Sequence, residues 1–308
     1  MKPTLLVLAA GMGSRYGGLK QLDGLGPNGE TIMDYSIFDA LRSGFGKVVF
    51  IIKKSFEKDF REKFLKRYEC IVPIEIVSQS LDRLPQGFSL HAKRTTPWGT
   101  NHAVMIGKEK THEPFAVINA DDFYGQNSFK ILANYLKSSE GKQGNYVMIA
   151  YKICDTLSES GAVARGICEI DKNGFLTSIT ECTCITRDDN GKIKYKNDKN
   201  NWGTLNENIF VSMNMWGFTP EYFNYSENLF VDFLAKNQYD LKAEFFIPSV
   251  VNQLIINKQA KVKVLETSSQ WFGITYWEDR KSVISKIQDL IQKGEYPKNL
   301  FQNRSNLP

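Results

Sequence analysis

Residues 5–21, LLVLAAGMGSRYGGLKQ, decide the fold of this chain. Their apolar first part, residues 5–10, predicts a buried strand. The loop that follows has four glycines in eight residues and also contains Ser14, Arg15 and Lys20. Because glycine lacks a Cβ and tolerates positive φ, such a loop can wrap closely around an anion and point its N–H groups inward. The arginine and lysine add positive charge, so the pattern predicts a strand followed by a triphosphate-binding loop.

Two common phosphate-binding patterns do not fit this loop. The dinucleotide pattern G-x-G-x-x-G fails because Tyr16 occupies the third glycine position. The pattern G-x-x-x-x-G-K-[ST] fails because Leu19 precedes Lys20 and Gln21 follows it. The loop therefore belongs to another class of phosphate-binding segment.

The composition is typical of a soluble globular protein, with 42% hydrophobic and 24% charged residues. A chain of 308 residues can form one large α/β domain or two smaller ones. The net charge of +5 is small and the lysines are spread along the chain, so we expect no nucleic-acid partner. We expect no membrane partner either, since no apolar stretch approaches the roughly 20 residues of a membrane span. Five scattered cysteines and the absence of a signal-peptide pattern predict free thiols and a cytoplasmic location.

Strands and helices alternate over the first half of the sequence. The expected strands are residues 5–10, 47–52, 74–77, 115–119 and 146–151, and the expected helices are 32–43, 54–67, 100–110 and 128–138. This alternation predicts an α/β fold with a doubly wound, mainly parallel, Rossmann-like sheet.

The second half has a different pattern, which predicts mixed strands and a C-terminal helix. Residues 166–170 and 175–181 form an expected hairpin that turns at Asn173 and Gly174. Residues 187–201 are polar, and we expect a mobile loop there. Further strands are expected at 209–218 and 261–266, and helices around 232–234 and at 246–255 and 282–292.

An acidic pair, Asp121 and Asp122, follows the apolar strand at 115–119 within NADDFYG. Ligands of open α/β sheets gather at the carboxyl ends of the strands. Carboxylates at that place suit Mg²⁺, which prefers few protein oxygens together with phosphate and water. The alternative is an aspartate that only caps a helix or a turn.

The stretch LAAGMGSR, followed by KQL and later by NADDFYG, resembles the signature of the sugar-phosphate nucleotidyltransferases. These include glucose-1-phosphate thymidylyltransferases and their uridylyl and cytidylyl relatives. The resemblance covers about residues 2–280 and is strongest over the first 125. It implies a nucleotidyltransferase domain at 1–280, with a nucleotide-binding half at 1–125, an acceptor-binding half at 126–280 and a helical tail at 281–308.

The resemblance also implies roles for individual residues. The catalytic residues would be Arg15, Lys20 and Asp121. The nucleotide-binding residues would be Ala9, Ala10, Gly11, Gly13, Ser14, Gln79, Gly99 and Thr100. Asp121 would hold the cofactor Mg²⁺, with Asp122 and Asp279 as alternatives.

Gln79 and Gly99 correspond to the residues that read the base in the family. A glutamine amide carries both a donor and an acceptor, which suits the N3–O4 edge of uracil or thymine and, when flipped, the edge of cytosine. We therefore expect a pyrimidine nucleotide, UTP or dTTP, unless Gln79 is an ordinary surface residue. His102 is expected to line the pocket without a catalytic role.

The later half departs from the family pattern at two positions. Glu181 and Asn214 take the places of residues that contact the sugar, so they are the expected acceptor-binding residues. Cys182, however, replaces a lysine that touches phosphate, and Gly273 replaces an aspartate that is the second metal ligand. Either one carboxylate suffices, or another acid such as Asp279 or Asp122 substitutes for that aspartate, or metal use or catalysis is weakened.

The expected reaction joins a nucleoside triphosphate to a sugar-1-phosphate and releases pyrophosphate. One alternative is a cytidylyltransferase acting on a phospho-alcohol such as phosphocholine. Another, suggested by Gly273 and Cys182, is a non-catalytic nucleotide or sugar-phosphate sensor. A glycosyltransferase that uses a finished nucleotide sugar is disfavoured, because Arg15 and Lys20 suit a triphosphate. The expected partners are the two small substrates, and the sequence leaves the oligomeric state open.

Overall fold

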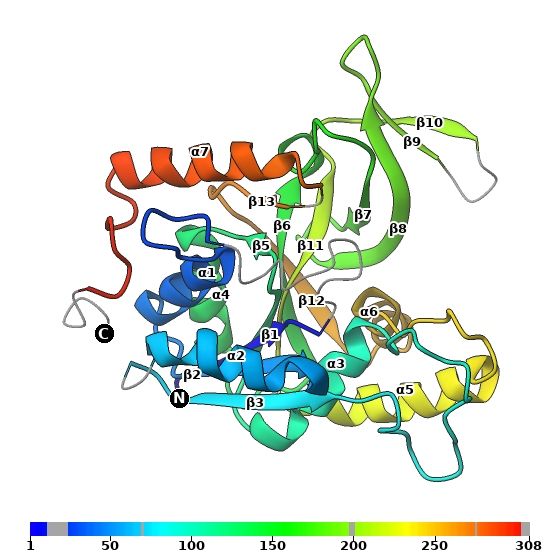
Figure 1. Cartoon of the computed structure of the whole chain (residues 1–308). Coiled ribbons are helices and arrows are strands. Elements are labelled where there is room, and N and C mark those ends of the chain that lie inside the picture. Colours follow the sequence, from blue (N-terminus) through cyan, green and yellow to red (C-terminus); the bar gives the residue numbers. More distant parts are fainter. Residues whose placement is uncertain (11–23, 69–70, 197–200, 275, 303–308) are drawn as a thin grey trace.

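The computed structural model describes residues 1–10, 24–68, 71–196, 201–274 and 276–302. These residues form an 11-stranded mixed sheet flanked by helices, together with a two-stranded sheet (Figure 1). The predicted triphosphate-loop residues Gly11, Gly13, Ser14, Arg15 and Lys20 lie outside the described residues.

Four parallel strands form the part of the sheet built from the first half of the chain. In spatial order they are β3 (Ile74–Gln79), β2 (Lys47–Lys53), β1 (Thr4–Leu8) and β4 (Phe115–Asn119). Their carboxyl ends therefore meet at one edge, where α/β sheets bind ligands.

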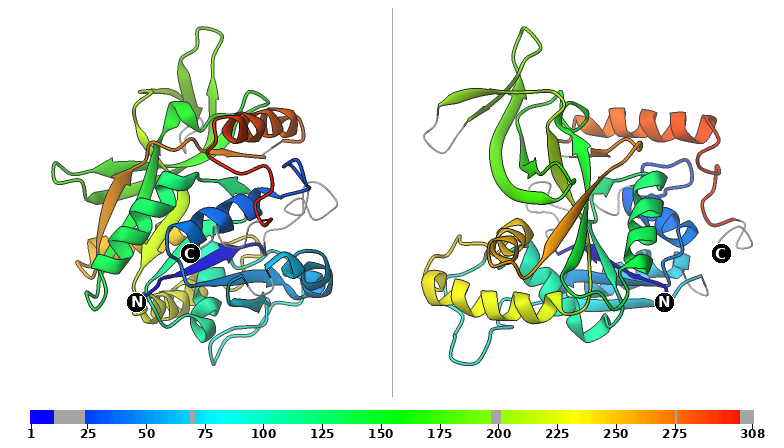
Figure 2. Two further views of the ribbon diagram at one scale, coloured as in Figure 1. Left: turned by 90° about the vertical axis from the view of Figure 1, so that its left-hand side faces the viewer. Right: turned by 180° about the vertical axis from the view of Figure 1, so that it is seen from behind.

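Helices cover both faces of these strands, as the right-hand view of Figure 2 shows. One face packs against α1 (Ile32–Arg42), α2 (Glu57–Lys63) and α4 (Gln126–Ser138), and the other against α3 (Thr100–Ile106), α5 (Tyr222–Asn237) and α6 (Ile247–Ile256). Each face of the sheet has its own hydrophobic core, and β1 contributes side chains to both. Leu5 and Val7 face the first set of helices, and Leu6 faces the second. Burial on both faces explains the continuous apolar runs of the strands and confirms the predicted doubly wound α/β fold.

Strand β11 (Phe210–Phe218) joins the two halves of the sheet. Its last three residues pair antiparallel with β4, whereas Val211 and Ser212 pair with β7 (Val163–Ile170). Between the two ladders the register shifts, and Asn214 adopts a left-handed backbone with φ of 59°. The strands β4 and β7 therefore separate at Asn214, at the carboxyl end of β4.

The remaining strands complete the sheet on both sides of β11. They are β6 (Asn145–Lys152), β12 (Lys261–Glu266), β8 (Leu176–Arg187), β9 (Ile193–Lys196) and β10 (Trp202–Leu205). The small sheet pairs β5 (Asp122–Phe123) with β13 (Phe272–Gly273). Strands β8, β9 and β10 extend away from the parallel strands at the top of Figure 1.

The predicted hairpin is confirmed, and the predicted loop after it is wrong in part. The Gly174 N–H donates to the carbonyl of Asp171 at 2.9 Å, and Gly174 has the positive φ that this turn needs. Residues 193–196, which we expected in a loop, form β9 because Ile193 is buried and the segment pairs with β8.

Three predicted elements are shorter or interrupted. The first strand ends at Leu8. The expected helix at 54–67 is split into η2 (Lys54–Phe56), α2 and η3 (Leu65–Tyr68), and that at 100–110 ends as η4 (Gly107–Lys110). Short 3₁₀ turns are common at helix ends. A further 3₁₀ turn, η5 (Ile153–Asp155), follows β6.

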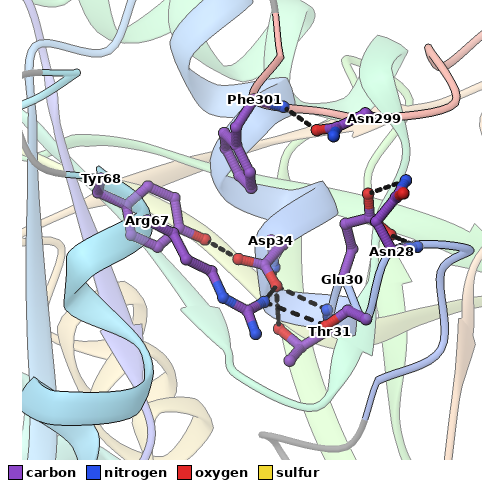
Figure 3. Close-up of polar contacts among 9 residues, drawn as sticks. Asn28, Glu30, Thr31, Asp34, Arg67, Tyr68, Asn299 and Phe301 are labelled. Carbon is purple, nitrogen blue, oxygen red and sulfur yellow. Dashed lines mark hydrogen bonds and ion pairs between the residues drawn. The ribbon is translucent and has the colours of Figure 1, made fainter.

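A buried carboxylate fixes the start of α1 (Figure 3). Thr31 and Asp34 form a capping box, and Asp34 also accepts hydrogen bonds from Arg67, at 2.6 Å, and from the Tyr68 hydroxyl. Burial raises the pKa of Asp34, while the Arg67 charge lowers it. Phe301, near the C-terminus, packs on Tyr68 with ring centroids 5.1 Å apart. The network therefore joins α1, η3 and the C-terminal segment.

The C-terminal segment packs against α1. Helix α7 (Asp279–Gln292), the last helix of the described chain, is followed by Tyr296, whose hydroxyl donates to Asp39 at 2.7 Å. The Arg42 guanidinium lies 4.8 Å from the Tyr296 ring centroid. Among the described residues, no helix is both long and apolar enough to cross a membrane.

Candidate active site

The largest of the cavities considered below lies where β4 and β7 separate. It has a volume of about 530 Å³ and is bounded by β4, β7, β8, β11 and the start of α6. Its polar lining includes Asn119, Asp121, Asp122, Arg165, Glu181 and Asn214. We call it the acceptor cavity. The fold thus brings together residues that are almost 100 positions apart in the sequence.

Both predicted acceptor-binding residues, Glu181 and Asn214, line this cavity. Glu181 lies on β8 opposite Gly166, where burial raises the pKa of its carboxyl and the Arg165 charge lowers it. The Asn214 amide accepts a hydrogen bond from the Trp216 indole at 3.2 Å. Carboxylate and amide groups at these positions can hydrogen-bond the hydroxyls of a polar ligand.

The acidic pair lies on the cavity wall nearest β4. Asp121 is half-buried, and Asp122 is buried and accepts hydrogen bonds from the Asn119 amide at 2.9 Å and the Tyr124 hydroxyl at 3.2 Å. Burial, and then the charge of Asp121, raise the pKa of Asp122 to about 7. Two adjacent carboxylates in one cavity are therefore stabilised by a bound cation.

This donor set fits Mg²⁺. Within the described ranges, no three His, Cys, Asp or Glu side chains gather into a metal-binding group. A cation at Asp121 and Asp122 would complete its coordination with ligand and water oxygens, as Mg²⁺ commonly does.

The structure explains why position 273 is a glycine. Strand pairing aligns Gly273 with Asp122, and a Cβ at 273 would lie 2.7 Å from Asp122 Oδ1 and 3.1 Å from Trp271 Cζ2. The Asp122 carboxylate therefore occupies the space that a side chain at 273 would need. Of the two alternatives to Asp121 that the sequence offered, Asp122 lines the acceptor cavity together with Asp121.

Asp279, the other alternative, lies in a different environment. Its carboxylate accepts hydrogen bonds from the Ser158 and Ser160 hydroxyls, both at 2.9 Å, and from the Tyr276 N–H at 2.8 Å. It lines a separate cavity of about 200 Å³ next to α7. These bonds fix Asp279 at the start of that helix.

Arg165, which no sequence motif indicated, is a buried cation that lines both of these cavities. Its guanidinium donates to the carbonyls of Ala164, at 2.7 Å, and Thr156, and lies 4.8 Å from the Trp271 ring centroid. Burial lowers its pKa to about 10. Its Nε is buried without a hydrogen-bond partner in the described chain. In the β7–β8 ladder Arg165 pairs with Cys182, so a cation lies across from the position where the family has lysine.

Gln79, at the end of β3, lines a third cavity of about 430 Å³ at the carboxyl ends of β2 and β3. We call it the β2–β3 cavity. Gln79 Nε2 lies 3.0 Å from His102 Nδ1 and 3.5 Å from the Gly99 carbonyl oxygen. Thr100, which follows Gly99 in the sequence, lines the acceptor cavity. Of the predicted base-reading residues, Gln79 therefore lines the β2–β3 cavity, and Gly99 directly precedes a residue of the acceptor cavity.

Position 99 must be a glycine because the backbone of Phe245 passes close to it. Gly99 has φ of 98°, and a Cβ there would lie 2.6 Å from both the nitrogen and the oxygen of Phe245. Phe245 in turn donates to Trp98 and accepts from Asn101, at 2.7 and 2.9 Å. A structural constraint thus coincides with the position expected to read the base.

Of the predicted loop, the structure describes Ala9 and Ala10, which are both buried after β1. The Ala9 N–H donates to the Ile51 carbonyl at 2.8 Å. This bond extends the pairing with β2 one residue beyond the strand, so the chain enters residues 11–23 from the carboxyl edge of the parallel strands.

Comparisons with known proteins agree with this architecture. A family model described as Nucleotidyl transferase matches residues 5–289. No curated protein sequence matches the chain.

The solved structures that are similar in fold to this chain include the following three. A UDP-glucose pyrophosphorylase complexed with UDP-glucose has 15% identity and a TM-score of 0.61, covering 94% of this chain and 99% of its own. An inositol-1-phosphate CTP transferase from T. maritima has 14% identity and a TM-score of 0.57, covering 94% and 97%. A putative glucose-1-phosphate thymidylyltransferase from Bacillus anthracis, in complex with a sucrose, has 14% identity and a TM-score of 0.61, covering 93% and 95%.

Because the family model spans nearly the whole chain, this protein belongs to the nucleotidyl transferase family. The family resemblance and the α/β fold predicted from the sequence are thereby confirmed.

Proposed function

We propose that this protein is a Mg²⁺-dependent nucleotidyltransferase that joins a pyrimidine nucleoside triphosphate, UTP or dTTP, to a sugar-1-phosphate. The products are a nucleotide sugar and pyrophosphate. The observation that carries the proposal is the acceptor cavity, in which Asp121 and Asp122 face the same space as Glu181 and Asn214. A metal-binding acidic pair beside a polar pocket suits an acceptor that has both a phosphate and hydroxyl groups.

The roles of the residues follow from the chemistry of phosphoryl transfer. An oxygen of the acceptor phosphate attacks the α-phosphorus of the triphosphate, and pyrophosphate leaves. A phosphate monoester is already an anion at neutral pH, so catalysis depends on positioning and on neutralising charge rather than on a protein base. Arg15 and Lys20 would supply fixed positive charge to the phosphates, and the Gly11–Ser14 segment would supply N–H donors.

Asp121 and Asp122 would hold Mg²⁺, which neutralises phosphate charge when it is bound. Glu181 on β8 and Asn214 on β11, two strands separated in the sheet by β7, would hydrogen-bond the acceptor's hydroxyls. Arg165 would attract the acceptor's negative charge, because its buried guanidinium lines the acceptor cavity. The domain division that we propose has a nucleotide-binding half at 1–125, an acceptor-binding half at 126–280 and a helical tail at 281–308.

A cytidylyltransferase acting on a phospho-alcohol is the second candidate. It is favoured by the similarity in fold to an inositol-1-phosphate CTP transferase. The two candidates differ in the base and in the number of hydroxyls that the acceptor offers to Glu181 and Asn214.

The decisive experiment measures pyrophosphate release. The protein is incubated with Mg²⁺, each of the four nucleoside triphosphates and a panel of sugar-1-phosphates, phosphocholine and inositol-1-phosphate. Release with UTP or dTTP and a sugar-1-phosphate supports the proposal, and release only with CTP and a phospho-alcohol supports the second candidate. Binding of nucleotide without release would identify a sensor.

Variants of the glycine-rich segment test the triphosphate site within the same assay. Arg15→Ala and Lys20→Ala should each lower turnover by about 10²-fold or more, because each removes a charge that acts on the transition state. Circular dichroism should be unchanged. If both variants keep wild-type rates, the assignment of the triphosphate to this segment is wrong.

A further inference from the structure

The Gln79 amide has a fixed neighbour that the sequence did not reveal. Its Nε2 lies 3.0 Å from Nδ1 of His102, a side chain buried within α3. The other ring nitrogen, His102 Nε2, lies 3.2 Å from the carbonyl oxygen of Arg83. The ring also packs against Phe230, with centroids 5.1 Å apart. Both polar atoms of the imidazole are therefore used, and the ring is held in place.

The carbonyl of Arg83 decides which nitrogen of His102 carries the proton. A carbonyl oxygen can only accept, so His102 Nε2 must donate to it. Burial lowers the pKa of His102 to about 4, so the ring is neutral at neutral pH and has a single N–H. Nδ1 consequently has a lone pair and must accept a hydrogen bond.

Since Nδ1 accepts, the group of Gln79 that faces it must be the NH₂ group. The amide oxygen Oε1 then points to the opposite side, and reversing the amide would place two acceptors 3.0 Å apart. The sequence left both orientations of this amide open, and the second one suited cytosine.

We propose that His102 is a positioning residue that fixes the Gln79 amide with Oε1 as the acceptor for the base, so that the enzyme selects uracil or thymine over cytosine. The inference rests on the proposed function, in which Gln79 reads the base. Uracil and thymine have an N–H donor at N3, whereas N3 of cytosine is an acceptor. With the amide fixed, cytosine in the same position would bring two acceptors together, and a mismatch of this kind costs about tenfold or more in affinity.

The first test measures the tautomer of His102 in the wild-type protein, without nucleotide, by ¹⁵N NMR of the imidazole at pH 7. We expect a protonated Nε2 and an unprotonated Nδ1. A ring protonated at Nδ1 would overturn the inference. This test does not depend on a variant that folds, or on activity.

The second test compares the binding of UTP, dTTP and CTP by calorimetric titration with Mg²⁺ present. His102→Phe keeps an aromatic ring beside Phe230 but removes the Nδ1 acceptor, so the amide can rotate. His112→Phe, the same substitution at an exposed residue outside both cavities, is the matched control. We expect wild type and the control to favour UTP over CTP by tenfold or more, and His102→Phe to reduce this ratio to about threefold or less.

The outcomes separate the inference from the proposed function. An unchanged ratio in folded His102→Phe, or a preference for CTP in wild type, overturns the inference and leaves nucleotidyl transfer in place. If none of UTP, dTTP and CTP supports pyrophosphate release by the wild-type protein, the proposed function is wrong, and the inference is wrong with it. Gln79→Ala in the His102→Phe background should change the ratio no further, because the two residues act through one contact.

Discussion

Gly273→Ala tests whether the Asp122 carboxylate fills the space of a side chain at position 273. The added Cβ would lie 2.7 Å from Asp122 Oδ1, 3.1 Å from Trp271 Cζ2 and 3.3 Å from the Asp121 carbonyl oxygen. Asp122 cannot easily move away, because Asn119 and Tyr124 hold its other oxygen. Overpacking of a tightly packed site costs about 1–3 kcal/mol, and we expect a loss of stability in this range.

The assay is equilibrium unfolding in urea, followed by circular dichroism, without metal. The matched control is a double-mutant cycle with Asp122→Ala. When the carboxylate is absent, the added methyl group has room, so Gly273→Ala should cost at least about 1 kcal/mol less in that background. In the intact protein the displaced carboxylate should also weaken Mg²⁺ binding, measured by titration calorimetry.

Two results would refute this reasoning. If Gly273→Ala is as stable as wild type, the space at position 273 is not filled by Asp122. If the cost is the same with and without the Asp122 carboxyl group, then the clash comes from other atoms. In either case Gly273 would be an unexplained departure from the family pattern.

Three other predictions concern single groups of the site. Arg165→Gln should raise the KM for the acceptor about tenfold or more and leave nucleotide affinity unchanged in calorimetry, because the buried charge faces the acceptor cavity; equal effects on both substrates would contradict this role. Asp121→Asn should abolish most turnover and weaken Mg²⁺ binding, while Asp122→Asn should be milder; the reverse order would make Asp122 the main ligand. The His102 pKa of about 4 lies below the value of about 6.5 in an unfolded chain, so the stability linked to it is present above pH 6.5 and is lost as the pH falls towards 4. Wild type should therefore lose about 2 kcal/mol more than His102→Phe between pH 7 and pH 5 in urea unfolding, and equal losses would contradict a neutral buried ring.

The local sequence determined the parallel half of the fold. Apolar runs such as residues 47–52 and 115–119 have a continuous hydrophobic character because each strand is buried on both faces, and this property is visible without the tertiary structure. The acidic pair after β4 was found for a similar reason, since it follows directly on such a run. In β9 only Ile193 is fully buried, and the polar composition of the residues around it concealed the strand.

Only the tertiary structure decided which residues of the site meet. The pairing of Arg165 with Cys182 and of Asp122 with Gly273 depends on strand register, and a shift of one residue would turn each side chain to the other face. The contact between Gln79 and His102 joins a strand to a helix 23 residues later. The sequence named the acidic pair and the acceptor residues because motifs carry them, whereas contacts between distant segments follow from the packing of the whole chain.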